Sequence, residues 1–118
     1  MYLSIYERIL LSQSIGYELD TIETILSNNT SRHELTPENI AHFENGKRVL
    51  SAVLQQINTN FFAVDFDDEQ LYHLRYAVAL QLEALMDALL ADEPMSPDEY
   101  EILSDAVNTL LLFYQRFQ

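Results

Sequence analysis

Apolar residues recur every three or four positions along most of this chain, and this spacing predicts one amphipathic helix after another. The clearest case follows Asp67, where leucine or valine stands at positions 71, 74, 78, 82, 85 and 89. β-branched residues are scattered and do not alternate with polar ones, so no sheet is expected. The pattern therefore predicts an all-α protein.

We expect the first helix to run from about Leu3 to Leu26, and Asn28 to Leu35 to form the turn that ends it. The second helix is predicted to start at Thr36, because a hydroxyl N-cap there precedes Pro37 at the first helical position. Its apolar stripe continues to Ile57.

The third helix is expected to open near Asp67, with Gln70 as its capping-box partner. The fourth opens at Ser96, where Glu99 completes a second capping box, and its core positions are expected to begin with Tyr100. The short connection between these two helices makes them antiparallel neighbours. The predicted architecture is an up-down four-helix bundle, built from two helical hairpins in one domain over residues 1–118.

Both glycines fall inside predicted helices, where glycine costs about 1 kcal/mol relative to alanine. A first hairpin that turns near Arg32 would place Gly16 level with Gly46. We therefore expect a close helix crossing at the two glycines, or alternatively a kink in the first helix near Gly16.

Composition excludes several classes of protein. The chain has no cysteine, which excludes disulfides, thiolate metal sites and cysteine nucleophiles. No apolar run approaches the roughly 20 residues that a membrane span needs. No basic segment followed by an apolar core comes after Met1, so we expect a soluble protein located in the cytoplasm.

Signals for catalysis or cofactor binding are weak. Glu38 with His42 and Glu69 with His73 stand four residues apart, whereas a di-iron helical bundle uses a spacing of three. The sequence contains no glycine-rich phosphate loop and no nucleophile elbow. We therefore expect no metal, no cofactor and no enzymatic activity.

Charge is the strongest remaining signal, since 19 acidic residues face six Lys and Arg and give a net charge of −13. This charge opposes direct binding to nucleic acid. In an up-down bundle the end of the first helix and the turn between the third and fourth would share one acidic pole. The candidate partner-binding residues there are Glu18, Asp20, Glu23, Asp92, Glu93, Asp98, Glu101 and Asp105.

Three of these, Asp98, Glu101 and Asp105, recur on one face of the fourth helix and form a row of carboxylates that roughly resembles a phosphate backbone. The alternative interpretation is an ordinary solvated face, because acidic residues are favoured near helix N-termini and opposite an apolar stripe.

The fourth helix also carries more apolar surface than one core face can bury. Either this helix is central, or its outer face meets another copy of the chain. The candidate residues of such a homodimer interface are Leu111, Phe113, Tyr114 and Phe117. Beside Asp65, the linker phenylalanines Phe61, Phe62 and Phe66 either form an exposed docking segment or fold back on the bundle.

Two functional hypotheses follow. The first is a non-enzymatic inhibitor or masking protein that covers a basic surface of a partner protein, which could itself bind nucleic acid. In composition the chain resembles phage-encoded inhibitors of host defence, nuclease immunity proteins and antitoxins, although this resemblance carries no motif and assigns no site. The second hypothesis is a homo-oligomeric structural or assembly module whose acidity keeps it soluble.

Overall fold

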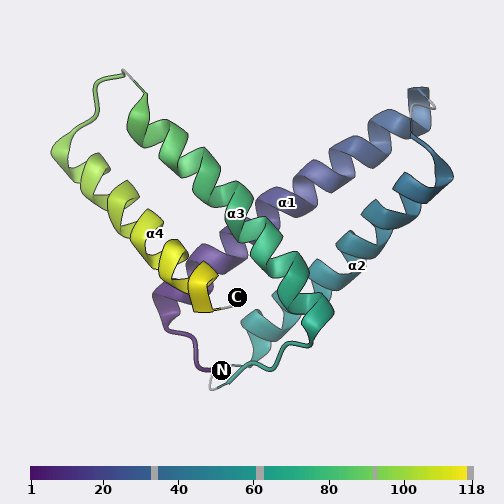
Figure 1. Cartoon of the computed structure of the whole chain (residues 1–118), viewed down its shortest axis with the longest axis horizontal. Coiled ribbons are helices and arrows are strands. Elements are labelled where there is room, and N and C mark those ends of the chain that lie inside the picture. The colour runs from purple at the N-terminus through teal and green to yellow at the C-terminus, as the bar shows by residue number, and fades with distance from the viewer. Residues whose placement is uncertain (33–34, 61–62, 92, 117–118) are drawn as a thin grey trace.

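The computed structural model describes residues 1–32, 35–60, 63–91 and 93–116, without the side chains of residues 29–32. These ranges form four helices, α1 (Ile5–Arg32), α2 (Pro37–Thr59), α3 (Asp68–Leu90) and α4 (Pro97–Arg116) (Figure 1). The described ranges contain no strand, and the predicted all-α class is confirmed.

Three helices start at the capping residues that the sequence predicts. The Thr36 hydroxyl accepts a hydrogen bond of 3.2 Å from the N–H three residues on, and Ser96 does the same at 3.2 Å. Asp67 and Gln70 exchange side-chain to backbone hydrogen bonds of 2.7 and 3.0 Å and form a full capping box. These contacts satisfy N–H groups that the first turn of a helix leaves free.

The limits of α1 differ from the prediction at its C-terminal end. Its start carries another capping box, in which Ser4 and Glu7 exchange hydrogen bonds of 3.0 and 3.1 Å. The helix continues to Arg32, so the predicted turn beginning at Asn28 is wrong. No glycine or proline stands between Gly16 and Pro37, and polar residues such as Asn28 are tolerated within a helix that is already formed.

The most extensive helix contacts join α1 with α2 and α3 with α4, so the predicted arrangement of two hairpins is supported in part. Figure 1 shows that the hairpins cross and that their tips diverge, so the molecule is V-shaped, with extents of 46 × 39 × 23 Å. α1 packs against all three other helices, whereas α2 and α4 share no contact within the described chain. The four helices therefore do not lie side by side along their whole lengths.

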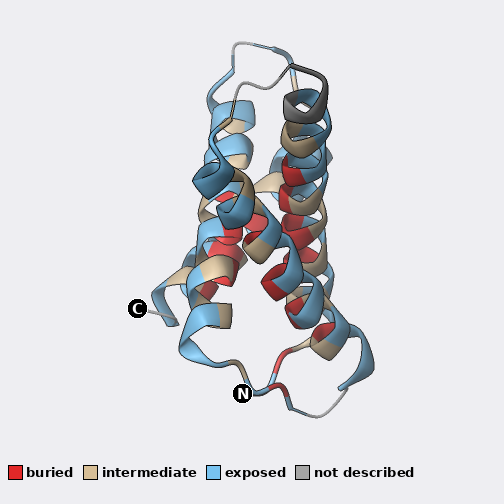
Figure 2. Ribbon diagram, turned by 90° about the vertical axis from the view of Figure 1, so that its right-hand side faces the viewer, coloured by how far each residue is buried: buried red, intermediate tan, exposed pale blue. Residues whose placement is uncertain are grey.

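The core lies where the hairpins cross, and Figure 2 shows the buried residues on the sides of the helices that face one another. Residues exposed by no more than 1% come from all four helices and include Leu11, Ile15, Val53, Leu74, Val78, Leu110 and Phe113. Tyr100, predicted as a core position, is 57% exposed. It lies near the tip of the α3–α4 hairpin, beyond the crossing that covers the middle of each helix.

The predicted contact between the two glycines is wrong. A Cβ atom built on Gly16 would meet nothing within 4 Å, whereas one on Gly46 would lie 3.6 Å from Ile22 Cδ1 and 3.6 Å from His73 Cε1. α1 extends to Arg32, beyond its predicted end, and Ile22 rather than Gly16 lies opposite Gly46. α1 is also assigned as one continuous helix through Gly16.

The connection between α2 and α3 is held by the start of the chain. Met1 and Val64 exchange two hydrogen bonds, of 2.8 and 2.9 Å, and Val64 is buried. Phe66 is partly buried and packs against the core. This residue therefore folds back on the bundle and is not part of an exposed docking segment. Phe61 and Phe62 lie outside the described residues.

Candidate binding site

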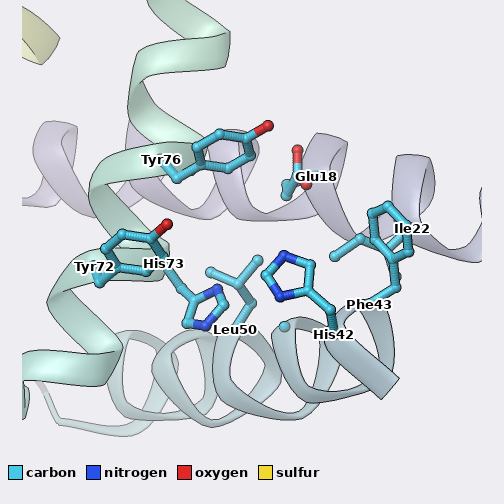
Figure 3. A pocket seen from close by; sticks show the side chains of 9 residues that line it. Glu18, Ile22, His42, Phe43, Leu50, Tyr72, His73 and Tyr76 are labelled. Atoms are coloured by element: carbon cyan, nitrogen blue, oxygen red, sulfur yellow. The ribbon is translucent and has the colours of Figure 1, made fainter. Parts of the chain in front are cut away.

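A cleft lies between the two hairpins, and side chains from α1, α2 and α3 line it (Figure 3). Its free volume is about 80 Å³. We call it the interhairpin cleft, and its lining residues are Glu18, Ile22, His42, Phe43, Gly46, Leu50, Tyr72, His73 and Tyr76.

The local sequence explains why this cleft is open. Gly46 has no side chain, which leaves free the space between Ile22 on α1 and His73 on α3. Leu50, one turn along α2, is only 1% exposed and is more buried than Ile22 and Glu18, which line the same cleft. On α3, Tyr72 and His73 meet edge to face with ring centroids 5.4 Å apart. Aromatic and imidazole rings therefore form much of the wall of the cleft.

Glu18 is the only buried carboxylate among the described residues and is 9% exposed. It forms no hydrogen bond or ion pair within the described chain. Burial raises the pKa of this carboxyl group, because removal from water disfavours the charged form. In Figure 3 Glu18 lies beside Tyr76 and above the ring of His42.

His73 is the second group in the cleft whose pKa is shifted. Burial is the largest cause that lowers its pKa; nearby Glu69 acts in the opposite direction, and His42 and Arg48 lower it further. Proximity of imidazole and carboxylate groups raises the question of a metal. Among the described residues, no three His, Cys, Asp or Glu side chains are placed to hold one.

The acidic row, Asp98, Glu101 and Asp105, lies on the exposed side of α4, while Val107 and Leu110 face the core. No ion pair joins these three carboxylates to a described cation. The described basic side chains are engaged elsewhere. Ion pairs join Lys47 to Glu23, Arg48 to Glu69 at 3.7 Å and Arg116 to Glu7 at 3.0 Å.

The predicted acidic pole does not form as one cluster. Asp20 and Glu23 are exposed on the α1–α2 hairpin, whereas Glu93 precedes α4 and the acidic row occupies the first half of that helix, on the α3–α4 hairpin. The two tips point apart because the hairpins cross (Figure 1). Asp92 is outside the described residues. Glu18, proposed as an exposed contact, is instead buried in the interhairpin cleft.

The residues predicted to form a homodimer interface do not lie together on one surface. Phe113 is 1% exposed and belongs to the core, with the Arg116 guanidinium 5.4 Å from its ring centroid, so it cannot form an outer interface. Leu111 is 37% exposed and Tyr114 is partly buried. Both line an outer groove of about 370 Å³ between α3 and α4, which we call the α3–α4 groove. Phe117 lies outside the described residues.

Sequence reasoning did not find the interhairpin cleft, whose residues come from three helices at long separations. The one available signal was Gly46, a glycine within a helix, which was assigned to a different contact.

Within the described chain, no helix combines the length and apolar character needed to cross a membrane. A cytoplasmic location stays a prediction.

Comparisons with models of protein families, with curated proteins and with solved structures find no match. The function proposed below therefore rests on the residues of this chain alone.

Proposed function

We propose that this protein binds a basic surface of a partner protein and masks it, without catalysing a reaction. The observation that carries the proposal is the acidic row: three exposed carboxylates at helical spacing, none of which is paired with a described cation. Unpaired carboxylates remain free to meet a partner's lysine and arginine side chains.

The net charge of the chain supports this proposal. A charge of −13 on 118 residues generates a field that speeds the encounter with basic partners and repels acidic ones. Complementary charge mostly sets the association rate and the choice of partner. The field is strongest where carboxylates are grouped and unopposed, and the acidic row meets both conditions.

Exposed apolar side chains stand beside the row. Tyr100 is 57% exposed and Ile102 is 66% exposed, although both lie between acidic residues of α4. Aromatic side chains are enriched at the centres of protein interfaces, because they bury a large area at small entropic cost. Tyr100 is the residue that we propose as the apolar anchor of the contact.

Affinity capture from the source cell tests the proposal. The immobilised protein should retain basic proteins that are released as the salt concentration rises, because salt screens contacts between exposed charges. The Asp98→Lys, Glu101→Lys, Asp105→Lys variant should lose them. The matched control, Glu44→Lys, Glu83→Lys, Asp87→Lys, changes the net charge equally at exposed positions of α2 and α3 and should retain them. Equal capture by both variants would refute a role for the row.

A second candidate function is self-assembly through the α3–α4 groove. Leu90 is 79% exposed, Met86 44% and Leu111 37%, and all three line this groove. Apolar side chains that gather on one outer face are typical of protein interfaces. Association through this groove should persist at high salt, in contrast to binding through the acidic row.

A further inference from the structure

Glu18 is unusual because the residue is largely buried and its side chain has no partner among the described residues. Only 9% of the surface of this residue is exposed, and no described group donates a hydrogen bond to its carboxylate. Its carboxylate oxygens keep some contact with solvent, because Arg8 Nη2 is the only fully buried side-chain polar atom without a hydrogen-bond partner in the described chain. A largely desolvated charge without a counter-ion is still unfavourable. The carboxylate stands in an open cleft, so a partner can reach it from solution.

The surroundings of Glu18 favour a cation as that partner. Tyr72 and Tyr76 line the same cleft and are 57% and 54% exposed, so their rings are accessible from outside. The faces of tyrosine rings attract cations, and this attraction strengthens when water is excluded. A cleft that contains both a carboxylate and tyrosine rings thus offers a counter-charge and favourable walls.

We propose that the interhairpin cleft binds the side-chain ammonium group of a lysine, with Glu18 as counter-ion and Tyr72 and Tyr76 as walls. The inference rests on the proposed function, because the lysine belongs to the basic surface of the partner protein. The lysine in the cleft would be one defined contact between the two proteins, in addition to the attraction between the acidic row and the basic surface of the partner.

Size and ligand number distinguish an ammonium group from other cations. The free volume of about 80 Å³ suits the compact end of a lysine chain better than the broad, planar guanidinium of arginine. A metal ion is disfavoured because the described residues do not provide three suitably placed ligands. The lysine methylenes would lie against Ile22 and Phe43, the apolar side chains of the cleft.

Binding should weaken as the pH falls. The titratable groups that face the ammonium are Glu18 from α1, His42 from α2, and Tyr72, His73 and Tyr76 from α3. Glu69 and Arg48 act on His73 from just outside the cleft. Acidification neutralises Glu18, whose pKa is raised, and gives His73 a positive charge. Both changes oppose a bound cation.

A titration with N-acetyl-lysine methylamide, followed by NMR, tests the cleft without any partner. The ring resonances of His42, His73, Tyr72 and Tyr76 should shift and saturate with a dissociation constant in the millimolar range. N-acetyl-norleucine methylamide, which lacks the ammonium group, should cause no saturable shift, and N-acetyl-arginine methylamide should bind more weakly than the lysine probe.

Two variants test the mechanism of binding. Glu18→Gln removes the counter-charge without a change in shape and should weaken lysine binding by about tenfold or more, because it leaves the ammonium without a counter-ion. Gly46→Ala places a methyl group between Ile22 and His73 and should weaken binding with the charge unchanged. Glu44→Gln, at an exposed position of α2 outside the cleft, is the control and should bind as the wild type does.

The proposal is overturned if the wild type shows no saturable shift, if Glu18→Gln binds lysine as tightly as the wild type, or if the norleucine or arginine probe binds as well as lysine. These outcomes concern the cleft alone. Failure of the proposed function would appear instead as unchanged partner binding after reversal of the acidic row, with lysine binding in the cleft intact.

Discussion

The guanidinium of Arg8 donates a hydrogen bond of 2.7 Å to the backbone carbonyl of Ile57 and a second one, of 3.2 Å, to the carbonyl of Leu3. Ile57 lies in the last turn of α2, which contains no basic residue of its own. A cation from α1 therefore meets the carbonyl end of the α2 dipole. Arg8 ties the open ends of the first hairpin together.

Arg8→Ala should lower the free energy of unfolding by about 2 kcal/mol, since hydrogen bonds to charged groups contribute roughly 1.5–3 kcal/mol each. Burial of its Nη2 atom, which has no hydrogen-bond partner, offsets part of this contribution. Arg48→Ala is the control, because that side chain is 70% exposed and its ion pair is long, at 3.7 Å. Urea unfolding measures both, and equal stabilities for the two variants would contradict this role of Arg8.

The sequence predicted the helices better than their arrangement. Thr36, Asp67 and Ser96 signal helix starts through chemistry that acts within three residues, and the structure uses all three. The crossing of the hairpins depends on how side chains from distant segments fit together, and periodicity does not record this. For the same reason the exposed Tyr100 and the buried Phe113 could not be distinguished in advance.

The candidate site was predictable only in part. The acidic row follows directly from the spacing of Asp98, Glu101 and Asp105 along one helix, and all three are exposed. The single acidic pole required an assumption about how the hairpins align, and that assumption was wrong. The burial of Glu18 comes from packing between α1, α2 and α3, which the sequence of α1 alone does not determine.

Gly16→Ala and Gly46→Ala should each raise the free energy of unfolding by about 0.5–1 kcal/mol, because alanine is the better helix former. Neither position is crowded: the nearest atoms to an added Cβ at Gly46 lie at 3.6 Å, an ordinary contact distance. Thermal unfolding measures the effect. A loss of stability at Gly46 would show that Ile22 and His73 cannot accommodate the methyl group.

Phe113→Glu and Leu111→Glu should differ sharply although the residues are two positions apart. The first places a charge in the core and should destabilise the fold by more than about 3 kcal/mol. The second lies at a 37% exposed site and should leave helix content unchanged. If the α3–α4 groove mediates self-association, sedimentation should show a wild-type dimer and a monomeric Leu111→Glu variant. A monomeric wild type would refute that interface.

Glu18→Gln should be more stable than the wild type at neutral pH. Burial raises the pKa of Glu18 in the folded state, so the folded protein binds this proton more tightly than the unfolded chain does. Wild-type stability therefore falls as the pH rises from the ordinary glutamate range through the raised pKa. The glutamine variant lacks this loss. Unfolding at several pH values should show a difference that is small in acid and reaches a plateau above that pKa.

Glu101→Gln, at an exposed position of α4, is the control for removal of one negative charge. A pH-dependent gain of the same size in this variant would show that the effect arises from net charge and not from the burial of Glu18.

The central claim is that the acidic row guides a basic partner to this protein. Its most direct test is the association rate of the partner recovered by affinity capture, measured at low and physiological salt. The Asp98→Lys, Glu101→Lys, Asp105→Lys variant should bind about tenfold or more slowly than the wild type, with a flatter salt dependence. The matched reversal of Glu44, Glu83 and Asp87 should be affected much less. Equal rates and equal salt slopes for the two triple variants would contradict it.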